Sequence, residues 1–277
     1  MKSWVNPKWR AGLFLALANA AWMWAAWQWT DREEWLWLTP IALSINFLLL
    51  TYDQILSFSR LESHRLEGQD PWGLLKIVHR LSEKFAVREP RVFLLSQPSA
   101  QIFSYARSGY ATRLYVTEGA LKLLTAGELE AALTFQMVAA RRAQTILNYW
   151  VGAVLDLLYR LGRGIERAFA FVFGWTPALA AAFIRPFMWA MQWTLMSRRD
   201  FEKLDRETAR LLTSPEDLAR ALWKMDAYAQ TMPWRDPWVF AHMCIVSPLQ
   251  KNHVFDRITL QPSLSSRIRR LTGRYPL

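Results

Sequence analysis

Cysteine and histidine, the residues that most often bind transition metals, are scarce in this chain. Of its 277 residues one is cysteine and four are histidine. The single cysteine, Cys244, excludes an internal disulfide and a thiolate metal cluster, and we expect it to be a small core residue. The histidines are His64, His79, His242 and His253, and no two of them have the HxxxH spacing that brings two imidazoles to one helical face. We expect all four to be structural.

Acidic residues are also in deficit. Lys and Arg number 34 against 23 Asp and Glu, which gives a formal net charge of +11. Such an excess suits nucleic acid or an anionic membrane surface. No recognised nucleic-acid-binding motif is present, and the chain also lacks the GxSxG, P-loop and GxGxxG fingerprints of other catalytic or nucleotide-binding centres. We therefore expect a lipid bilayer, and no nucleic acid, as a partner.

Charge is absent from two long apolar runs near the N-terminus. Ala11 to Trp29 and Trp35 to Tyr52 each approach the roughly 20 residues that cross a hydrocarbon core as a helix. The first run is too long for a secretory signal, and no small-residue cleavage pattern follows it. We therefore predict a transmembrane hairpin over residues 1–52. The basic N-terminal tail predicts that the N-terminus and the soluble domain are cytoplasmic.

A second apolar region, residues 145–196, is interrupted by charge. We predict two more spans there, four in all, joined by a turn that holds the arginines of residues 160–167. Asp156 and Arg185 either pair across these two helices or lie near an interface and extend toward water. The arginines of the turn conflict with the predicted orientation, and a re-entrant or interfacial pair would remove that conflict.

Residues 53–144 and 197–277 are predicted as the two parts of one mainly helical α+β domain with a small sheet. Residues 91–95 and 114–117 are the β-rich runs, and the polar stretch between them allows a third strand. Thr125 and Glu128 form a capping box that begins a helix. The other predicted helices begin at Asp70, Glu118, Ser214 and Leu264.

The predicted C-terminal part holds a loop rich in tryptophan and proline, residues 231–248. Its large apolar side chains, Trp234, Trp238 and Phe240, either fold back onto the domain or form an exposed partner-binding patch. In the last helix we expect the arginines, Arg267 among them, to face solvent or lipid.

The order of these features resembles a known family. Two N-terminal spans, two later spans and four phrases together look like an HtpX-type membrane zinc metallopeptidase, a gluzincin of the bacterial-type inner (plasma) membrane. The resemblance covers nearly the whole chain. The phrases are LLKIVHRLSEKFAVREPRVFLLSQPSAQIFSYA, YVTEGALKLLTAGELEAAL, SRRDFEKLDRETARLL and QPSLSSRIRRL.

The chain departs from that family where the metal would bind. The resemblance places HExxH on the helix after ELEAAL, where this sequence has Phe135 and Ala139 for the two histidines and Gln136 for the general base. Phe201 stands where a third ligand, a glutamate, is expected, and Gln261 stands where such proteins usually carry histidine. Asp205 matches an aspartate that orients the ligands. We predict that Phe135 and Phe201 meet as an aromatic plug in place of a metal.

These departures lead to three hypotheses. The first is a catalytically inactive pseudopeptidase, without cofactor, that serves as a membrane-embedded adaptor or accessory subunit and binds another membrane protein. The alternative is an active zinc-dependent endopeptidase in membrane-protein quality control. The third is a purely architectural subunit of a membrane complex.

Overall fold

The computed structural model describes the central and C-terminal parts of the chain. The predicted hairpin over residues 1–52 lies outside the described residues except for Ala20 and Trp24. Among the helices that are described, none combines the length and apolar character needed to cross a bilayer. The other described residues are 63–106, 111–142, 144–174, 198–232, 234, 240–248 and 261–273.

A four-stranded sheet forms one side of the domain, with the order β1-β2-β4-β3. β2 and β4 are parallel, while β1 and β3 pair antiparallel with their neighbours. The predicted strand 91–95 is confirmed, and the predicted strand 114–117 begins one residue earlier. The strands are β1 (Ser63–Arg65), β2 (Arg91–Leu95), β3 (Ile102–Tyr105) and β4 (Arg113–Thr117).

Two of the predicted helices, α3 and α4, are confirmed beside this sheet. In α3 (Leu74–Phe85) the apolar stripe of Leu74, Val78, Leu81 and Phe85 is buried, as its spacing predicts. The helix starts later than expected, with Gly73 at its N-cap, and Asp70 accepts a hydrogen bond from the Leu75 amide in the first turn at 2.6 Å. α4 (Glu118–Leu123) follows β4 directly and is capped by the Thr117 hydroxyl.

The central helix is α5 (Ala126–Arg141), which begins with the predicted capping box of Thr125 and Glu128. From Ala131 to Ala139 every side chain is buried, because α5 packs against α3, α6, α8, α9 and β3 at once. A helix buried on all sides suits its run of alanine, leucine and valine. This position makes α5 the element around which the rest of the domain is arranged.

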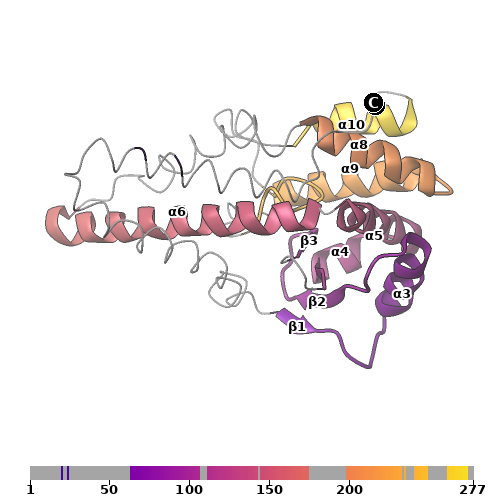
Figure 1. Cartoon of the computed structure of the whole chain (residues 1–277), viewed down its shortest axis with the longest axis horizontal. Coiled ribbons are helices and arrows are strands. Elements are labelled where there is room, and N and C mark those ends of the chain that lie inside the picture. The colour runs from indigo at the N-terminus through magenta and orange to yellow at the C-terminus, as the bar shows by residue number, and fades with distance from the viewer. Residues whose placement is uncertain are drawn as a thin grey trace.

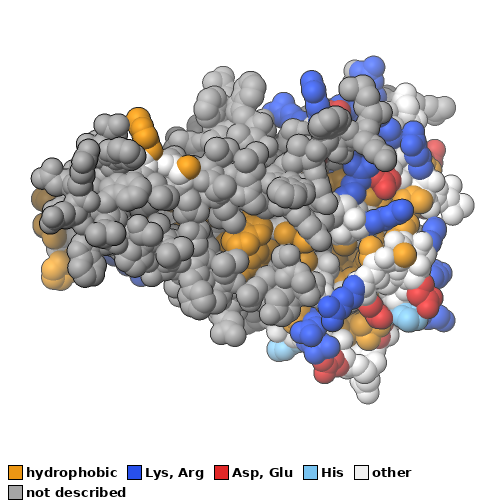
Figure 2. All heavy atoms as spheres, in the orientation of Figure 1, with side chains coloured by type: hydrophobic (Ala, Val, Ile, Leu, Met, Phe, Trp, Pro, Cys, Tyr) orange, Lys and Arg blue, Asp and Glu red, His pale blue; other side chains and the backbone are white. Residues whose placement is uncertain are grey.

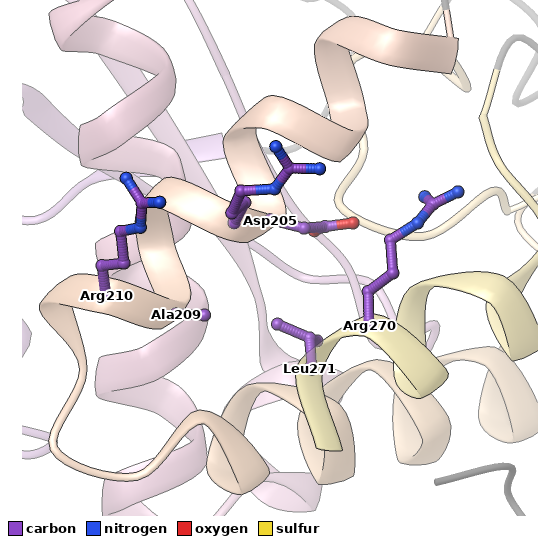
Figure 3. Close-up of a pocket in the computed structure, with 6 residues that line it drawn as sticks. Asp205, Ala209, Arg210, Arg270 and Leu271 are labelled. Atoms are coloured by element: carbon purple, nitrogen blue, oxygen red, sulfur yellow. The ribbon is translucent and has the colours of Figure 1, made fainter. Parts of the chain in front are cut away.

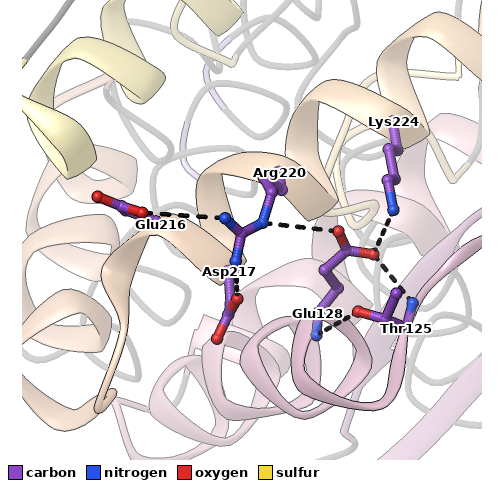
Figure 4. Close-up of polar contacts among 6 residues, drawn as sticks. All are labelled: Thr125, Glu128, Glu216, Asp217, Arg220 and Lys224. Carbon is purple, nitrogen blue, oxygen red and sulfur yellow. Dashed lines mark hydrogen bonds and ion pairs between the residues drawn. The ribbon is translucent and has the colours of Figure 1, made fainter.

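Glu128 also ties α5 to α9 (Pro215–Thr231), as Figure 4 shows. Its carboxylate accepts hydrogen bonds from Lys224 Nζ at 2.8 Å and from the Thr125 amide at 2.9 Å, and Arg220 lies 3.8 Å away. Burial by itself would raise the pKa of Glu128, but these donors outweigh it and hold the pKa below its usual value. The start of α5 and the middle of α9 are therefore held together by charge as well as by packing.

α6 (Gln144–Phe173) corrects the prediction of a second hairpin in its first half. Residues 160–167, predicted as a turn, are helical, and α6 continues through them along the long axis of the molecule (Figure 1). The uncharged run 145–155 is buried against the domain, where Leu147 and Val151 join the core. A short apolar run fits a buried helix better than a full span, which explains the difference. Residues 175–197 lie outside the described part.

Asp156 lies in this buried half of α6 and pairs with Arg160, one turn later, at 2.8 Å. The carboxylate is fully buried and its partner is about one-third exposed. Arg185, the partner predicted for Asp156 in one of the two alternatives, lies outside the described residues. The pair within α6 supplies one partner for this buried charge.

Two helices complete the C-terminal part. α8 (Arg198–Leu211) packs against α5, and α10 (Leu264–Thr272) packs against both α8 and α9. α9 begins at the predicted Ser214–Pro215 start, and its stripe of Leu218, Leu222 and Met225 is buried as expected. These contacts place α8 and α9 directly against α5, and Arg267 of α10 lies over the Phe135 ring.

Candidate functional site: the centre around α5

The three α5 positions that the family resemblance singles out are all buried in the core. Phe135, Gln136 and Ala139 are each exposed by 3% or less. Gln136 reaches across to the edge strand β3: its Nε2 donates to the Ile102 carbonyl at 3.1 Å, and its Oε1 accepts from the Ser104 hydroxyl at 2.6 Å. Both ends of the amide are therefore engaged in fixing α5 to the sheet.

A buried arginine covers the other side of this centre. Arg267 of α10 is 2% exposed and grips the Asp205 carboxylate with two hydrogen bonds, Nε to Oδ2 at 2.9 Å and Nη2 to Oδ1 at 2.7 Å. Its Nη1 donates to the Ile245 carbonyl at 2.5 Å, and its guanidinium carbon lies 5.3 Å from the centroid of the Phe135 ring. This is a bidentate ion pair with a cation–π contact, so α5, α8 and α10 meet at one charged group.

The expectation that Arg267 faces solvent or lipid is therefore wrong. Leu264, Ile268 and Leu271 mark one face of α10 at helical spacing, and Arg267 falls on that same face. A charge on an apolar stripe is stable only if it finds a partner inside. Asp205 supplies that partner, and the neighbours Arg269 and Arg270 are exposed as predicted.

The outer edge of β3 is covered by the chain's own residues 240–246, here named the cover segment. Phe103 forms an antiparallel bridge with Cys244, and the Ile245 amide donates to the Ile102 carbonyl at 3.0 Å. Gln261 holds the segment from outside, because its Nε2 donates to the carbonyls of Ala241 at 3.1 Å and Cys244 at 2.6 Å. A further strand would have to displace this segment before it paired with β3 at Ile102 and Phe103.

Comparison with known proteins finds the same family that the sequence resembles. The Protease HtpX homolog of Pelotomaculum thermopropionicum is 26% identical over 244 residues, which cover 84% of this chain and 86% of the relative. The Protease HtpX homolog of Desulfatibacillum aliphaticivorans is 28% identical over 247 residues, covering 85% of this chain and 79% of the relative. This chain is similar to HtpX homologues over most of its length. No protein-family model matches it.

The crystal structure of S. mikatae Ste24p has the same fold. It superposes on 95% of the HtpX-like chain with a TM-score of 0.53, and the chain spans about 65% of the length of that protein. At 13% identity the likeness concerns the fold alone. The resemblance predicted from the sequence is confirmed, and so is the mainly helical domain with a small sheet.

The side chains at the centre of the HtpX-like chain do not fit a zinc ion. Zinc in peptidases takes imidazole nitrogens and carboxylate oxygens. Phe135 and Ala139 offer hydrocarbon, the amide of Gln136 is engaged at both ends, and the carboxylate of Asp205 is bound by a guanidinium cation. Within the described ranges, no group of three or more His, Cys, Asp and Glu is placed to hold a metal.

Phe201 is buried with Phe135 in one core cluster, but the predicted aromatic plug takes a different form. Across the described residues no ring contact joins the two phenylalanines. The Phe135 ring faces Arg267, while Phe201 lies on the buried face of α8 one turn before Asp205. Packing around a fixed cation replaces the predicted stack of two rings.

Two residues of the Trp-rich loop belong to the core, so the interpretation of an exposed partner patch is wrong for them. Trp234 and Phe240 are 5% and 4% exposed, and their rings stack with centroids 5.5 Å apart. Both rings also contact Phe103 of β3, at 5.8 and 5.9 Å. Trp238 lies outside the described residues. Aromatic area of this size is more stable against the sheet than in water.

The remaining histidines and the cysteine agree with structural roles where they are described. His79 is exposed on α3 beside Glu83 and Glu89. Cys244 is buried on the β3 edge, and burial raises the pKa of its thiol, which keeps it protonated. His64 is exposed in β1. His253 lies outside the described residues.

His242 is a buried histidine that no pattern in the sequence marks out. Its Nε2 donates to the Asn148 carbonyl at 3.0 Å, and its Nδ1 is buried without a partner among the described residues. Burial lowers the pKa of His242 to about 4, although the Asn148 hydrogen bond acts in the opposite direction. The imidazole is therefore neutral in the folded protein at neutral pH.

This neutral histidine predicts a loss of stability in mild acid. Between pH 6.5 and about 4, His242 is protonated in the unfolded chain but not in the folded chain. The free energy of unfolding therefore falls as the pH falls through this window. The difference amounts to roughly 3 kcal/mol. Urea unfolding of the purified full-length protein at several pH values measures it. His242→Gln keeps a donor for Asn148 and should lose this part of the pH dependence; an unchanged dependence in the variant would contradict the assignment.

Proposed function

We propose that this HtpX-like chain is a catalytically inactive pseudopeptidase that acts as a membrane-embedded adaptor or accessory subunit for another membrane protein. One observation carries the proposal. At the three α5 positions where the resemblance expects two metal ligands and a general base, the side chains are committed to the core by Gln136's bonds to β3 and the Phe135–Arg267 contact. Neither hydrocarbon nor an amide activates water as a carboxylate on a metal does.

Contacts elsewhere in the domain also keep its shape without a metal. Asp205 and Arg267 join α8 and α10 over α5, and Gln261 fixes the cover segment on β3. A domain that keeps its shape but lacks metal ligands is suited to binding another protein.

The distal half of α6 supports the membrane part of the proposal. α6 projects beyond the described domain, and hydrophobic side chains gather at its far end (Figures 1 and 2). Phe171 is 93% exposed, and Val172 and Phe173 are exposed by more than 60%. Large exposed apolar side chains in one place are typical of membrane or protein contact. We place this end of α6 at the inner membrane of a bacterial-type cell.

A second candidate function is an active zinc-dependent endopeptidase. The relatives carry the name Protease HtpX homolog, and the similarity covers more than four-fifths of this chain. In this case the ligands would come from residues other than Phe135, Ala139 and Phe201. A purely architectural subunit is the third candidate.

Metal analysis separates the first two candidates. We expect the full-length protein, purified in detergent without chelator, to contain far less than one zinc per chain and to leave a denatured membrane-protein substrate intact. A variant with Phe135→His, Gln136→Glu, Ala139→His and Phe201→Glu, prepared in parallel, is the matched control for zinc retention during purification. Stoichiometric zinc in the unaltered protein, together with cleavage that a chelator stops, would show that the active-peptidase reading is right.

Photo-crosslinking in native membranes tests the adaptor role. A photoreactive residue at Phe171, on the exposed end of α6, is compared with one at Lys122, whose side chain is 78% exposed on the other part of the domain. We expect one defined membrane-protein adduct from position 171 that position 122 does not give. Adducts with lipid alone from position 171 would argue against an adaptor that binds through this end.

A further inference from the structure

A hollow of about 350 Å³ opens between α8 and α10, on the outer side of the Asp205–Arg267 pair. Ala209 and Leu271 form its floor. Figure 3 shows Arg210 of α8 and Arg270 of α10 on either side of that floor, with their guanidinium groups directed to the same side. Arg206 and Asp205 complete the lining, so three arginines and one acid surround the space.

The one acid in the lining does not neutralise these arginines, because Arg267 already binds Asp205 through two hydrogen bonds. Arg270 has one partner, Glu202, whose Oε1 lies 2.6 Å from its Nη2. Arg206 and Arg210 are exposed, and among the described residues neither has an ion pair or a hydrogen bond from its side chain. The hollow therefore carries excess positive charge.

The other acids of α8 are also engaged elsewhere. Asp200 lies 3.6 Å from Lys203, and Glu207 pairs with Arg142 of α5. No acid of α8 is left for Arg206 and Arg210, which stand one turn apart on the same helix. Like charges at this spacing repel each other. An anion between them would remove that repulsion.

We propose that this hollow, the arginine pocket of Arg206, Arg210 and Arg270, binds a phosphate group. Guanidinium forks match phosphate oxygens in pairs and are less strongly hydrated than lysine ammonium groups, so arginines on two facing helices suit a tetrahedral anion. The space also admits atoms attached to the phosphate. The phosphate belongs either to a lipid headgroup or to a soluble phosphate compound, and both present the same chemistry to the pocket.

Binding measurements on the full-length protein in neutral detergent test the pocket. The probes are inorganic phosphate and detergent-dispersed phosphatidic acid, with phosphatidylcholine as the lipid control. We expect one or both phosphate probes to raise the melting temperature, and the double variant Arg206→Gln with Arg210→Gln to weaken binding by about tenfold or more. A response to phosphatidic acid alone identifies a lipid headgroup, whereas a response to inorganic phosphate that competes with the lipid identifies a soluble ligand.

A matched variant separates a site from general charge. Lys76→Gln with Arg88→Gln removes the same two charges from exposed positions on and after α3, far from the pocket in sequence. Arg210→Lys keeps the charge but loses the fork, and should also weaken binding. Equal losses in both double variants, or no response of the unaltered protein to either phosphate probe, would overturn the proposal. The zinc and cleavage results leave this test unaffected, because no α5 residue is changed.

Discussion

Replacing Arg267 by methionine is expected to lower the free energy of unfolding by about 3–5 kcal/mol, the range for breaking a buried ion pair from one side. The substitution leaves the Asp205 carboxylate, 1% exposed, without its counter-charge and removes a donor from the Ile245 carbonyl. It also uncovers the face of the Phe135 ring. Denaturant unfolding of the full-length protein, followed by tryptophan fluorescence, measures the change.

Two further variants make this prediction specific. Arg269→Met, at an exposed position of the same helix, should cost much less than Arg267→Met. Adding Asp205→Asn to Arg267→Met should recover a large part of the loss, because the unpaired buried charge is then gone. If Arg267→Met costs no more than the Arg269 variant, the ion pair does not hold α8 and α10 together.

Changing Phe135 to histidine and Phe201 to glutamate should also be costly when no zinc is present. Removing two large buried side chains costs several kcal/mol on its own, by about 2–5 kcal/mol per site for large-to-small changes. The new glutamate would lie one helical turn from Asp205, and a protonated histidine would face the Arg267 guanidinium. We therefore expect a melting temperature well below that of the unaltered protein.

The matched control keeps both sites apolar. Phe135→Leu with Phe201→Leu removes the rings without adding polar groups, so its loss should be clearly smaller. Zinc added to the histidine and glutamate variant should restore little stability, because Ala139 still supplies no second imidazole. Unchanged melting in that variant would show that the centre around α5 is not held by packing.

Much of the domain follows from local patterns in the sequence. The α3 stripe, the Thr125–Glu128 capping box and the start of α9 each depend on residues a few positions apart, and all are found as predicted. β1 was missed because its Ser-His-Arg sequence has no β-branched or aromatic residue. The uncharged run at the start of α6 predicts a membrane span although it is buried in the domain, because lipid and a protein core favour the same side chains.

The candidate site was predictable only in its residue identities. Phe135, Gln136 and Phe201 come from the family resemblance, but their partners come from tertiary structure. Gln136 binds Ser104, 32 residues earlier, and Arg267 binds Asp205 across 62 residues. The charge of Arg267 predicts a surface position, whereas its place on the apolar face of α10 indicates burial.

The cover segment has a consequence for the order in which the protein is made. Its anchors, Gln261 and Arg267, follow β3 by more than 150 residues, so β3 is synthesised well before them. Until Gln261 and Arg267 leave the ribosome, the amides and carbonyls on the outer edge of β3 stay uncovered and open to pairing with a neighbouring nascent chain.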